Sequence, residues 1–139
     1  MAVLSLNQGS RAFALIVAVA LLASACGSSG TLSASALTKE STALQSLAAE
    51  GALLARDSAA GRTTGIYTRV HSQDLYKVAS KSAKSLQSAK TKPGLESKLR
   101  KTASLASKVS VDLKRLGHAS KAEQSRLAGE LESSAKELG

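Results

Sequence analysis

The sequence has 139 residues, of which 19 are Lys or Arg and 10 are Asp or Glu, so its formal net charge is +9. This length is enough for one domain. One Cys excludes an internal disulfide, and two Tyr, one Phe and no Trp are too few for the aromatic platform of a single-stranded nucleic-acid binder. We therefore expect neither a disulfide-stabilised scaffold nor a nucleic-acid partner.

The first 25 residues have the organisation of a signal peptide. No acidic residue occurs from Met1 to Ser10, and Arg11 supplies a positive charge. The 14 residues from Ala12 to Ala25 are apolar except for Ser24. Such a stretch suits the apolar region of a signal peptide and is short for a membrane-spanning helix, which needs about 20 apolar residues.

The apolar stretch ends in residues 22–27 (LASACG), which resemble the lipobox of bacterial lipoprotein precursors. The resemblance implies cleavage between Ala25 and Cys26 and attachment of a diacylglyceryl group to the Cys26 thiol. It also implies an address on the extracytoplasmic side of the cell membrane, or on the outer membrane of a two-membrane cell. The family favours Leu three places before the Cys, where this chain has Ala23. Two or more acyl chains hold a protein durably on a bilayer, so membrane lipid is the first partner that we expect.

The sequence leaves two alternatives to processing as a lipoprotein. Residues 23–25 (ASA) also fit an ordinary A-x-A cleavage site, which would release a soluble protein and leave Cys26 as an unexplained free thiol. An uncleaved anchor helix is disfavoured by the short apolar stretch. Under the lipoprotein hypothesis, residues 1–25 are the signal peptide, residues 26–34 are the acylated Cys and a flexible Gly- and Ser-containing tether, and residues 35–139 are the folded domain.

Helical spacing of apolar residues recurs through residues 35–139 and strand-like alternation does not, which predicts an all-α domain. A first helix is expected from about residue 35 to residue 60. A second is expected from Gly65 to about Lys90, with Thr63 or Thr64 as its N-cap. The predicted apolar face of the first helix comprises Leu37, Leu44, Leu47, Gly51 and Leu54, and that of the second comprises Tyr67, His71, Leu75, Val78, Ser82, Leu86 and Ala89.

A third helix is expected to begin at Pro93, because the missing N–H of proline costs nothing at the first helical position, and to stop at Gly117. Ser120 and Glu123 match a capping box at the start of a fourth helix. The third face comprises Leu95, Leu99, Thr102, Ala106, Val109, Leu113 and Leu116, and the fourth comprises Leu127, Leu131, Ser134 and Leu138. Short connections predict an antiparallel up-down bundle of four helices, with three helices and a loose first segment as the alternative.

Residues 71–74 (HSQD) bring a His, a Ser and an Asp into one helical segment. Neighbouring residues on a helix do not face each other, so Ser72 cannot readily meet His71, whereas His71 and Asp74 at i and i+3 can. We expect a partly buried His71 that is hydrogen-bonded to Asp74 beneath Tyr67 and Leu75. The alternative is a ligand-binding or pH-sensing pair in the core of a small-ligand carrier or sensor. A hydrolase built on this pair is the weakest hypothesis.

The sequence offers no further chemistry. It contains no P-loop, dinucleotide-binding, HExxH or CxxC motif, so we expect no cofactor and no enzymatic activity. His71, Asp74 and the distant His118 do not supply the three or four ligands of a metal site.

Basic residues concentrate in the middle of the chain. The segment from Arg69 to Lys101 contains nine Lys and Arg residues and two acidic residues, a local net charge of +7. It is either a solvated face that aids solubility or a surface that attracts phospholipid headgroups, an anionic envelope polymer or another envelope protein. Our leading hypothesis is a non-enzymatic, membrane-anchored lipoprotein with such a surface. The candidate binding residues are Lys77, Lys81, Lys84, Lys98, Arg100 and Lys101.

Overall fold

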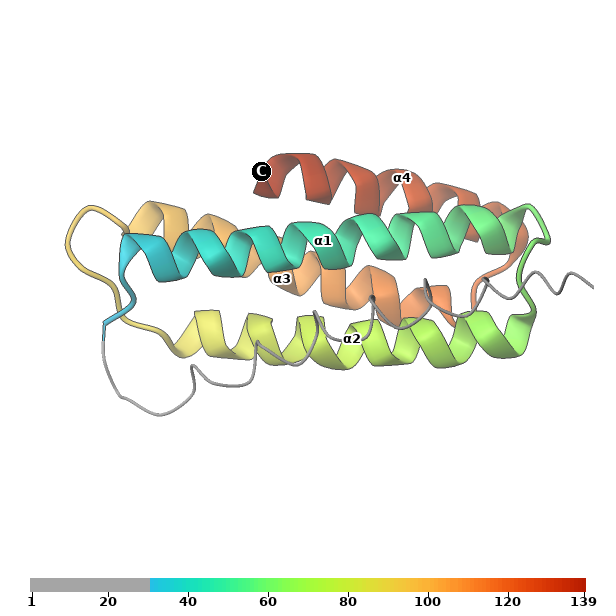
Figure 1. The fold of residues 1–139 in the computed structure, drawn as a ribbon, viewed down its shortest axis with the longest axis horizontal. Helices are drawn as coiled ribbons and strands as arrows, with labels where there is room; N and C mark the ends of the chain where they lie inside the picture. The colour runs from blue at the N-terminus through green and yellow to red at the C-terminus, as the bar shows by residue number, and fades with distance from the viewer. Residues whose placement is uncertain (1–30) are drawn as a thin grey trace, which may run out of the picture. The chain divides into compact units, whose positions relative to one another are not determined.

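The computed structural model describes residues 31–139, which fold into four α-helices. These are α1 (Ala34–Ala59), α2 (Gly65–Ser88), α3 (Glu96–Leu116) and α4 (Lys121–Leu138). Successive helices run in opposite directions, which confirms the predicted all-α, up-down bundle of four helices (Figure 1). The predictions for the signal peptide, the cleavage site and Cys26 lie outside the described residues.

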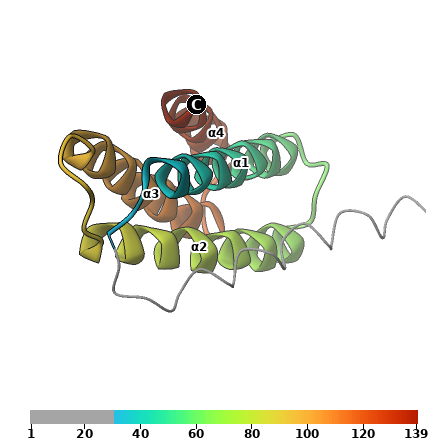
Figure 2. The ribbon, with the colours of Figure 1, turned by 60° about the vertical axis from the view of Figure 1, so that its left-hand side comes forward.

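The bundle is built from two antiparallel helix pairs. α1 packs most extensively against α4, and α2 packs most extensively against α3. The pairs meet where α3 contacts both α1 and α4, and where α1 contacts α2. α2 and α4 lie on opposite sides of the bundle and do not contact each other (Figures 1 and 2). We refer below to the α1–α4 pair and the α2–α3 pair.

Three of the four helices begin at a side-chain N-cap. Ser33, Thr64 and Ser120 each accept a hydrogen bond from the backbone N–H three residues later, at 3.2, 3.2 and 3.3 Å respectively. A hydroxyl at this position satisfies one of the amides that a helix start leaves without a partner. The predicted caps at Thr64 and Ser120 are therefore confirmed. The reciprocal half of the capping box does not form, because the Glu123 carboxylate accepts a hydrogen bond from Arg115 instead.

α3 begins at Glu96, so the predicted start at Pro93 is wrong by three residues. Pro93 and Gly94 form a turn in which the Leu95 N–H donates to the Lys92 carbonyl at 3.2 Å. Gly94 has a φ of +91°, which fits the third residue of a type II turn and does not fit a helix. Proline is as favourable at the second position of such a turn as at the first position of a helix, so its presence alone did not distinguish the two.

The buried face of α2 also differs from the predicted one. Tyr67 and Val78, which were expected inside, are 54% and 36% exposed. A Cβ atom on Gly117 at the end of α3 would lie 2.9 Å from the Ser72 hydroxyl oxygen, which shows how closely the two helices approach at this point. Because close approach needs small side chains, α2 turns mainly small residues inward. The buried residues of α2 are Thr68, Ser72, Leu75, Ala79, Ala83 and Leu86.

The other predicted faces agree with the structure. On α3 the predicted residues from Leu99 to Leu116 are buried, and on α4 all four predicted residues are buried. On α1, Leu47 is only partly buried, and the other four predicted residues are buried. A buried hydroxyl closes the α1–α4 pair, because Ser41 donates a hydrogen bond to the Leu138 carbonyl at 2.6 Å, a group that the end of α4 would leave unpaired.

Backbone contacts to the bundle begin before α1, within residues 26–34 that were predicted as a tether. The Leu32 N–H donates to the Lys90 carbonyl at 2.7 Å, and Leu32 forms an isolated parallel bridge with Thr91. Ser33 then caps α1. The chain therefore enters the bundle beside the loop that joins α2 to α3 (Figure 1).

Candidate anionic-surface site

Charge is divided unequally between the two helix pairs. Residues 65–116, which form the α2–α3 pair, contain twelve Lys and Arg residues and three acidic residues, a formal net charge of +9. The remaining described residues, 31–64 and 117–139, contain six basic and seven acidic residues, a net charge of −1. One half of the bundle is thus nearly neutral, and the other half carries the positive charge of the domain.

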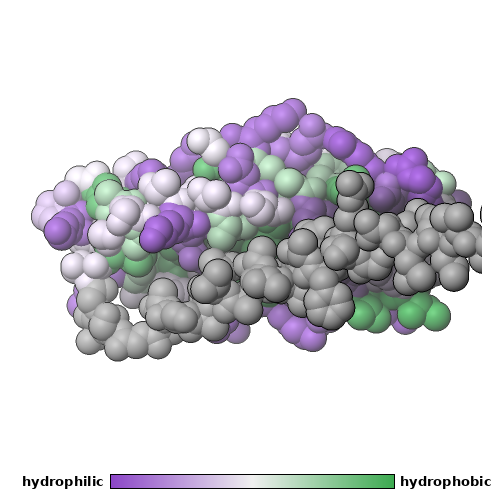
Figure 3. Space-filling model, viewed as in Figure 1, coloured by the Kyte–Doolittle hydropathy of each residue, from purple (hydrophilic) through white to green (hydrophobic). Residues whose placement is uncertain are grey.

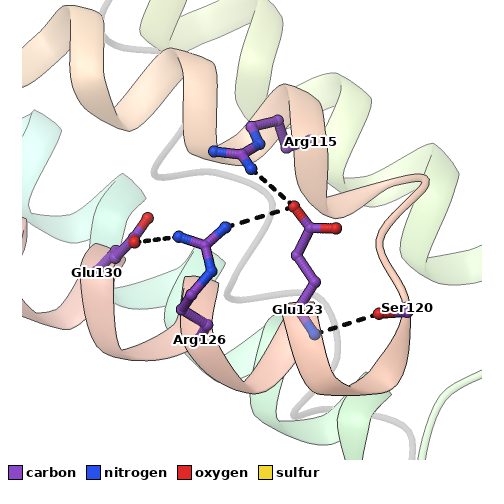
Figure 4. Close-up of polar contacts among 5 residues, drawn as sticks. All are labelled: Arg115, Ser120, Glu123, Arg126 and Glu130. Atoms are coloured by element: carbon purple, nitrogen blue, oxygen red, sulfur yellow. Dashed lines mark hydrogen bonds and ion pairs between the residues drawn. The ribbon is translucent and has the colours of Figure 1, made fainter.

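Four of the seven acidic residues of the nearly neutral half form ion pairs with arginines: Asp57, Glu123, Glu130 and Glu132. Arg56 of α1 pairs with Glu132 of α4. Glu123 accepts from Arg115 at 2.9 Å and from Arg126 at 3.4 Å, and Arg126 also pairs with Glu130, so a chain of charges joins α3 to α4 (Figure 4). All these side chains are partly exposed, and each such pair contributes about 0.2–1 kcal/mol at most.

Most cations of the α2–α3 pair have no such partner. Lys77 pairs with Asp74 at 3.1 Å. Within residues 31–139, the other five candidate residues form no ion pair, and all are exposed: Lys81, Lys84, Lys98, Arg100 and Lys101. The exposed Lys90 and Lys92 of the connecting loop belong to the same set, although the sequence reasoning left them out of the site.

The structure separates these cations into two groups. Lys77, Lys81 and Lys84 lie along the middle of α2. Lys98, Arg100 and Lys101 lie in the first turns of α3, where Lys98 Nζ is 3.3 Å from the Thr38 hydroxyl of α1. Lys90 and Lys92 lie in the loop that leads into α3 and so join the second group. The signal that could have placed them there is the Pro-Gly turn, because it brings the loop next to the start of α3.

One open groove lies beside the second group of cations. It occupies about 620 Å³ between the end of α2 and the start of α3. Lys90 and Arg100 line it together with Glu96, whose carboxylate accepts a hydrogen bond from the Gly94 N–H at 2.8 Å. The Thr91 hydroxyl, also in the lining, has no hydrogen-bond partner among the described residues. The apolar part of the lining consists of Leu86, Ala89, Leu99 and Ala103.

His71 and Asp74 have other partners than each other. His71 Nε2 lies 2.8 Å from a carboxylate oxygen of Glu50 on α1, and its ring stacks on Tyr67 with 5.5 Å between the ring centroids. Asp74 pairs with Lys77, so the expected His71–Asp74 hydrogen bond is wrong. It is wrong because α2 turns Thr68 and Ser72 inward, which moves His71 sideways to face α1.

Neither of the two grooves of residues 31–139 lies at the place predicted for a small ligand. The groove beside Lys90 does not include Tyr67, His71 or Asp74. A second groove, of about 480 Å³, lies between the end of α1 and α4 and does not include them either. The lining of this second groove comprises Arg56, Ala59, Ala60, Ser125, Ala128 and Gly129.

One titratable group in the described bundle is deeply buried. Asp112 on α3 is 4% exposed, and its Oδ2 atom has no hydrogen-bond partner among the described residues. Burial raises the pKa of this carboxyl, and the nearby Glu130 raises it further, against the opposing effect of Lys108, Arg115 and Arg126. None of the six candidate cations is among the groups that shift its pKa.

Residues 31–139 contain neither a metal-ligand cluster nor a membrane-spanning helix. No group of three or more His, Cys, Asp or Glu side chains in this range is arranged to hold a metal ion. No helix in the same range has the length and apolar character needed to cross a bilayer. Comparison of the whole chain with protein-family models, with curated proteins and with solved structures finds no match.

Proposed function

We propose that this chain is a membrane-anchored, extracytoplasmic lipoprotein without enzymatic activity, and that its α2–α3 pair binds an anionic surface of the cell envelope. The observation that carries the proposal is the division of charge, with +9 on the α2–α3 pair and −1 on the rest of the described domain. Such segregation gives one side of a small domain a strong positive potential, which attracts an anionic partner and raises the rate of encounter.

Solubility alone is a weaker explanation for this arrangement. A protein needs only a net charge away from zero to stay dispersed, and mixed charges over the whole surface serve that purpose. Here seven of the ten acidic residues lie outside the α2–α3 pair. Seven exposed cations from Lys81 to Lys101 have no ion-pair partner within residues 31–139. Repulsion among them costs stability, which a binding role would explain.

The anchor part of the proposal is supported by residues 22–27, which resemble a lipobox, and by the apolar stretch that precedes Cys26. The protein extracted from membranes of producing cells should have the mass of residues 26–139 plus two or three acyl chains. The Cys26→Ser variant should carry no acyl mass. A native product that begins at Met1, or one that begins at Cys26 with an unmodified thiol, would contradict the anchor.

The surface part is tested separately with the full-length Cys26→Ser chain, which acyl groups cannot hold on a bilayer. This chain should bind vesicles that contain phosphatidylglycerol more tightly than vesicles of phosphatidylcholine alone. The difference should shrink as the salt concentration rises, because salt screens interactions between exposed charges. Equal binding to both kinds of vesicle would mean that the positive charge of the α2–α3 pair is only a solvated face.

A further inference from the structure

The loop between α2 and α3 is also the place where the N-terminal segment joins the bundle. The Leu32 N–H donates to the Lys90 carbonyl at 2.7 Å, so the backbone that leads back toward Cys26 is fixed beside this loop. Only residues 27–31 separate Cys26 from Leu32. Six residue steps span at most about 20 Å when fully extended. If Cys26 carries lipid, this end of the bundle cannot lie far from the bilayer.

The same end holds a concentration of cations. We call it the tether end and define it as Lys90 and Lys92 of the loop with Lys98, Arg100 and Lys101 of α3. All five are exposed, and none forms an ion pair within residues 31–139. The acidic residue beside them, Glu96, is engaged by the Gly94 N–H. The five cations therefore exceed the local acidic charge by four.

The groove at the tether end has the mixed lining that suits the boundary of a bilayer. Lys90 and Arg100 provide cations in its lining. Leu86, Leu99 and Ala103 provide an apolar wall. A phospholipid presents an anionic phosphate next to hydrocarbon, so its headgroup region is complementary to this lining.

We infer that the tether end rests on the anionic phospholipid headgroups of the membrane that holds Cys26, so that the bundle stands end-on on the bilayer. The inference rests on the proposed lipid anchor and narrows the anionic surface to the headgroups themselves. This orientation also determines which end of the bundle points away from the membrane. α2 has 24 residues, so its two ends lie about 36 Å apart.

The far end of α2 is different in character. Ile66, Tyr67 and Val70 in its first two turns are all more than half exposed. Figure 3 shows apolar side chains at the end of the domain where α2 begins. An orientation with this end on the bilayer would move the five cations away from the headgroups. The six residue steps from Cys26 to Leu32 span at most about 20 Å and could not reach back along the length of α2. The end-on arrangement avoids both.

The test compares two triple variants in the full-length Cys26→Ser chain. The end variant is Lys90→Gln, Lys92→Gln and Arg100→Gln, and the middle variant is Lys77→Gln, Lys81→Gln and Lys84→Gln. Each removes three positive charges, so a nonspecific effect of net charge acts equally on both. Binding is measured by co-flotation with vesicles of phosphatidylcholine alone and of phosphatidylcholine with phosphatidylglycerol, and circular dichroism checks that each variant keeps its helices.

The end variant should lose at least about tenfold of its phosphatidylglycerol-dependent partition, because each cation close to an anionic leaflet contributes about fivefold. The middle variant should lose clearly less. A larger loss from the middle variant would mean that the side of α2 lies on the membrane, and no loss from either would mean that neither group touches headgroups. Both results overturn the end-on arrangement, and neither bears on acylation of Cys26, which intact mass decides.

Discussion

Asp112 is buried on α3 near Glu130 and Arg126 of α4, and one of its carboxylate oxygens has no hydrogen-bond partner among the described residues. Burial is the largest cause of its raised pKa, and the Glu130 carboxylate adds to it. A buried carboxylate is costly when it is not fully paired. The arginines that could pair with it, Arg115 and Arg126, bind Glu123 instead (Figure 4).

The raised pKa predicts a loss of stability with rising pH. Below the ordinary pKa of 3.8, Asp112 is neutral in the folded and unfolded chains. Above it, the unfolded chain releases the proton first, so the folded state loses stability until the pH passes the raised value. Asp112→Asn should therefore be more stable than wild type at pH 7 and should lack this part of the pH dependence. Urea unfolding between pH 4 and pH 8 measures both.

A matched control for this variant is Asp74→Asn. Asp74 is exposed and pairs only with the neighbouring Lys77. Its loss should change the free energy of unfolding by no more than a few tenths of a kcal/mol, because exposed pairs of this kind contribute little. Equal stability of Asp112→Asn and wild type at pH 7 would contradict this prediction. It would mean that burial of the ionised Asp112 carboxylate does not cost the folded state free energy.

At the scale of the helices, two glycines inside helices have opposite surroundings. A Cβ atom on Gly51 of α1 would lie 2.5 Å from Leu113 Cδ2 and 3.2 Å from Leu131 Cδ1, so three helices converge at this residue. A Cβ atom on Gly129 of α4 would meet no atom within 4 Å. Gly51 thus permits a close approach, whereas Gly129 only leaves its helix less rigid.

Gly129→Ala should stabilise the domain by about 0.5–1 kcal/mol, since glycine inside a helix costs that much relative to alanine. Gly51→Ala should lose this gain, because the new methyl group must displace the fully buried Leu113, and overpacking of a core costs about 1–3 kcal/mol. Thermal or urea unfolding of the two variants measures the difference. If both stabilise equally, the helices are not in close contact at Gly51.

Close approach also explains which helices were predictable from the sequence. The face of α3 was predictable because Leu99, Leu113 and Leu116 repeat at helical spacing and are buried. The face of α2 was not, because its interior is mostly Thr, Ser and Ala, which have the composition of a surface. A preference for large side chains in the interior predicts that Tyr67 is buried, whereas it is about half exposed. Only contact with α3 decides which side of such a helix is inside.

At the scale of the whole domain, the basic composition predicted a positive surface but not its shape. The six candidate cations form one set in the sequence, and the fold divides them between the middle of α2 and the tether end. The turn at Pro93 and Gly94 places Lys90 and Lys92 there, and the Leu32 N–H, which donates to the Lys90 carbonyl, brings the entering chain beside them. A contact between residues so far apart in the chain leaves no periodic signal, so sequence reasoning could not find it.

The same distribution of charge predicts how salt acts on the stability of the domain. The α2–α3 pair carries +9, so its cations repel one another across a compact surface, and the three acidic residues present cannot compensate. Salt shortens the range of this repulsion to about 10 Å at 0.1 M. The thermal midpoint of the wild-type chain should therefore rise as sodium chloride increases from about 0.01 M to about 0.3 M.

Removing part of the repulsion should have the same effect as salt. Neutralising Lys77, Lys81 and Lys84 to Gln should raise the low-salt midpoint by a few degrees, since about 1 kcal/mol corresponds to about 4–8 °C in a domain of this size, and should reduce the salt response. The matched control neutralises three cations of the nearly neutral half, Arg62, Lys121 and Lys136, and should not raise the midpoint, because there the charges already balance. A lower midpoint in the α2 variant would mean that its lysines stabilise the fold. A higher one would mean that the chain keeps them at a cost to its stability, as a surface that serves binding would.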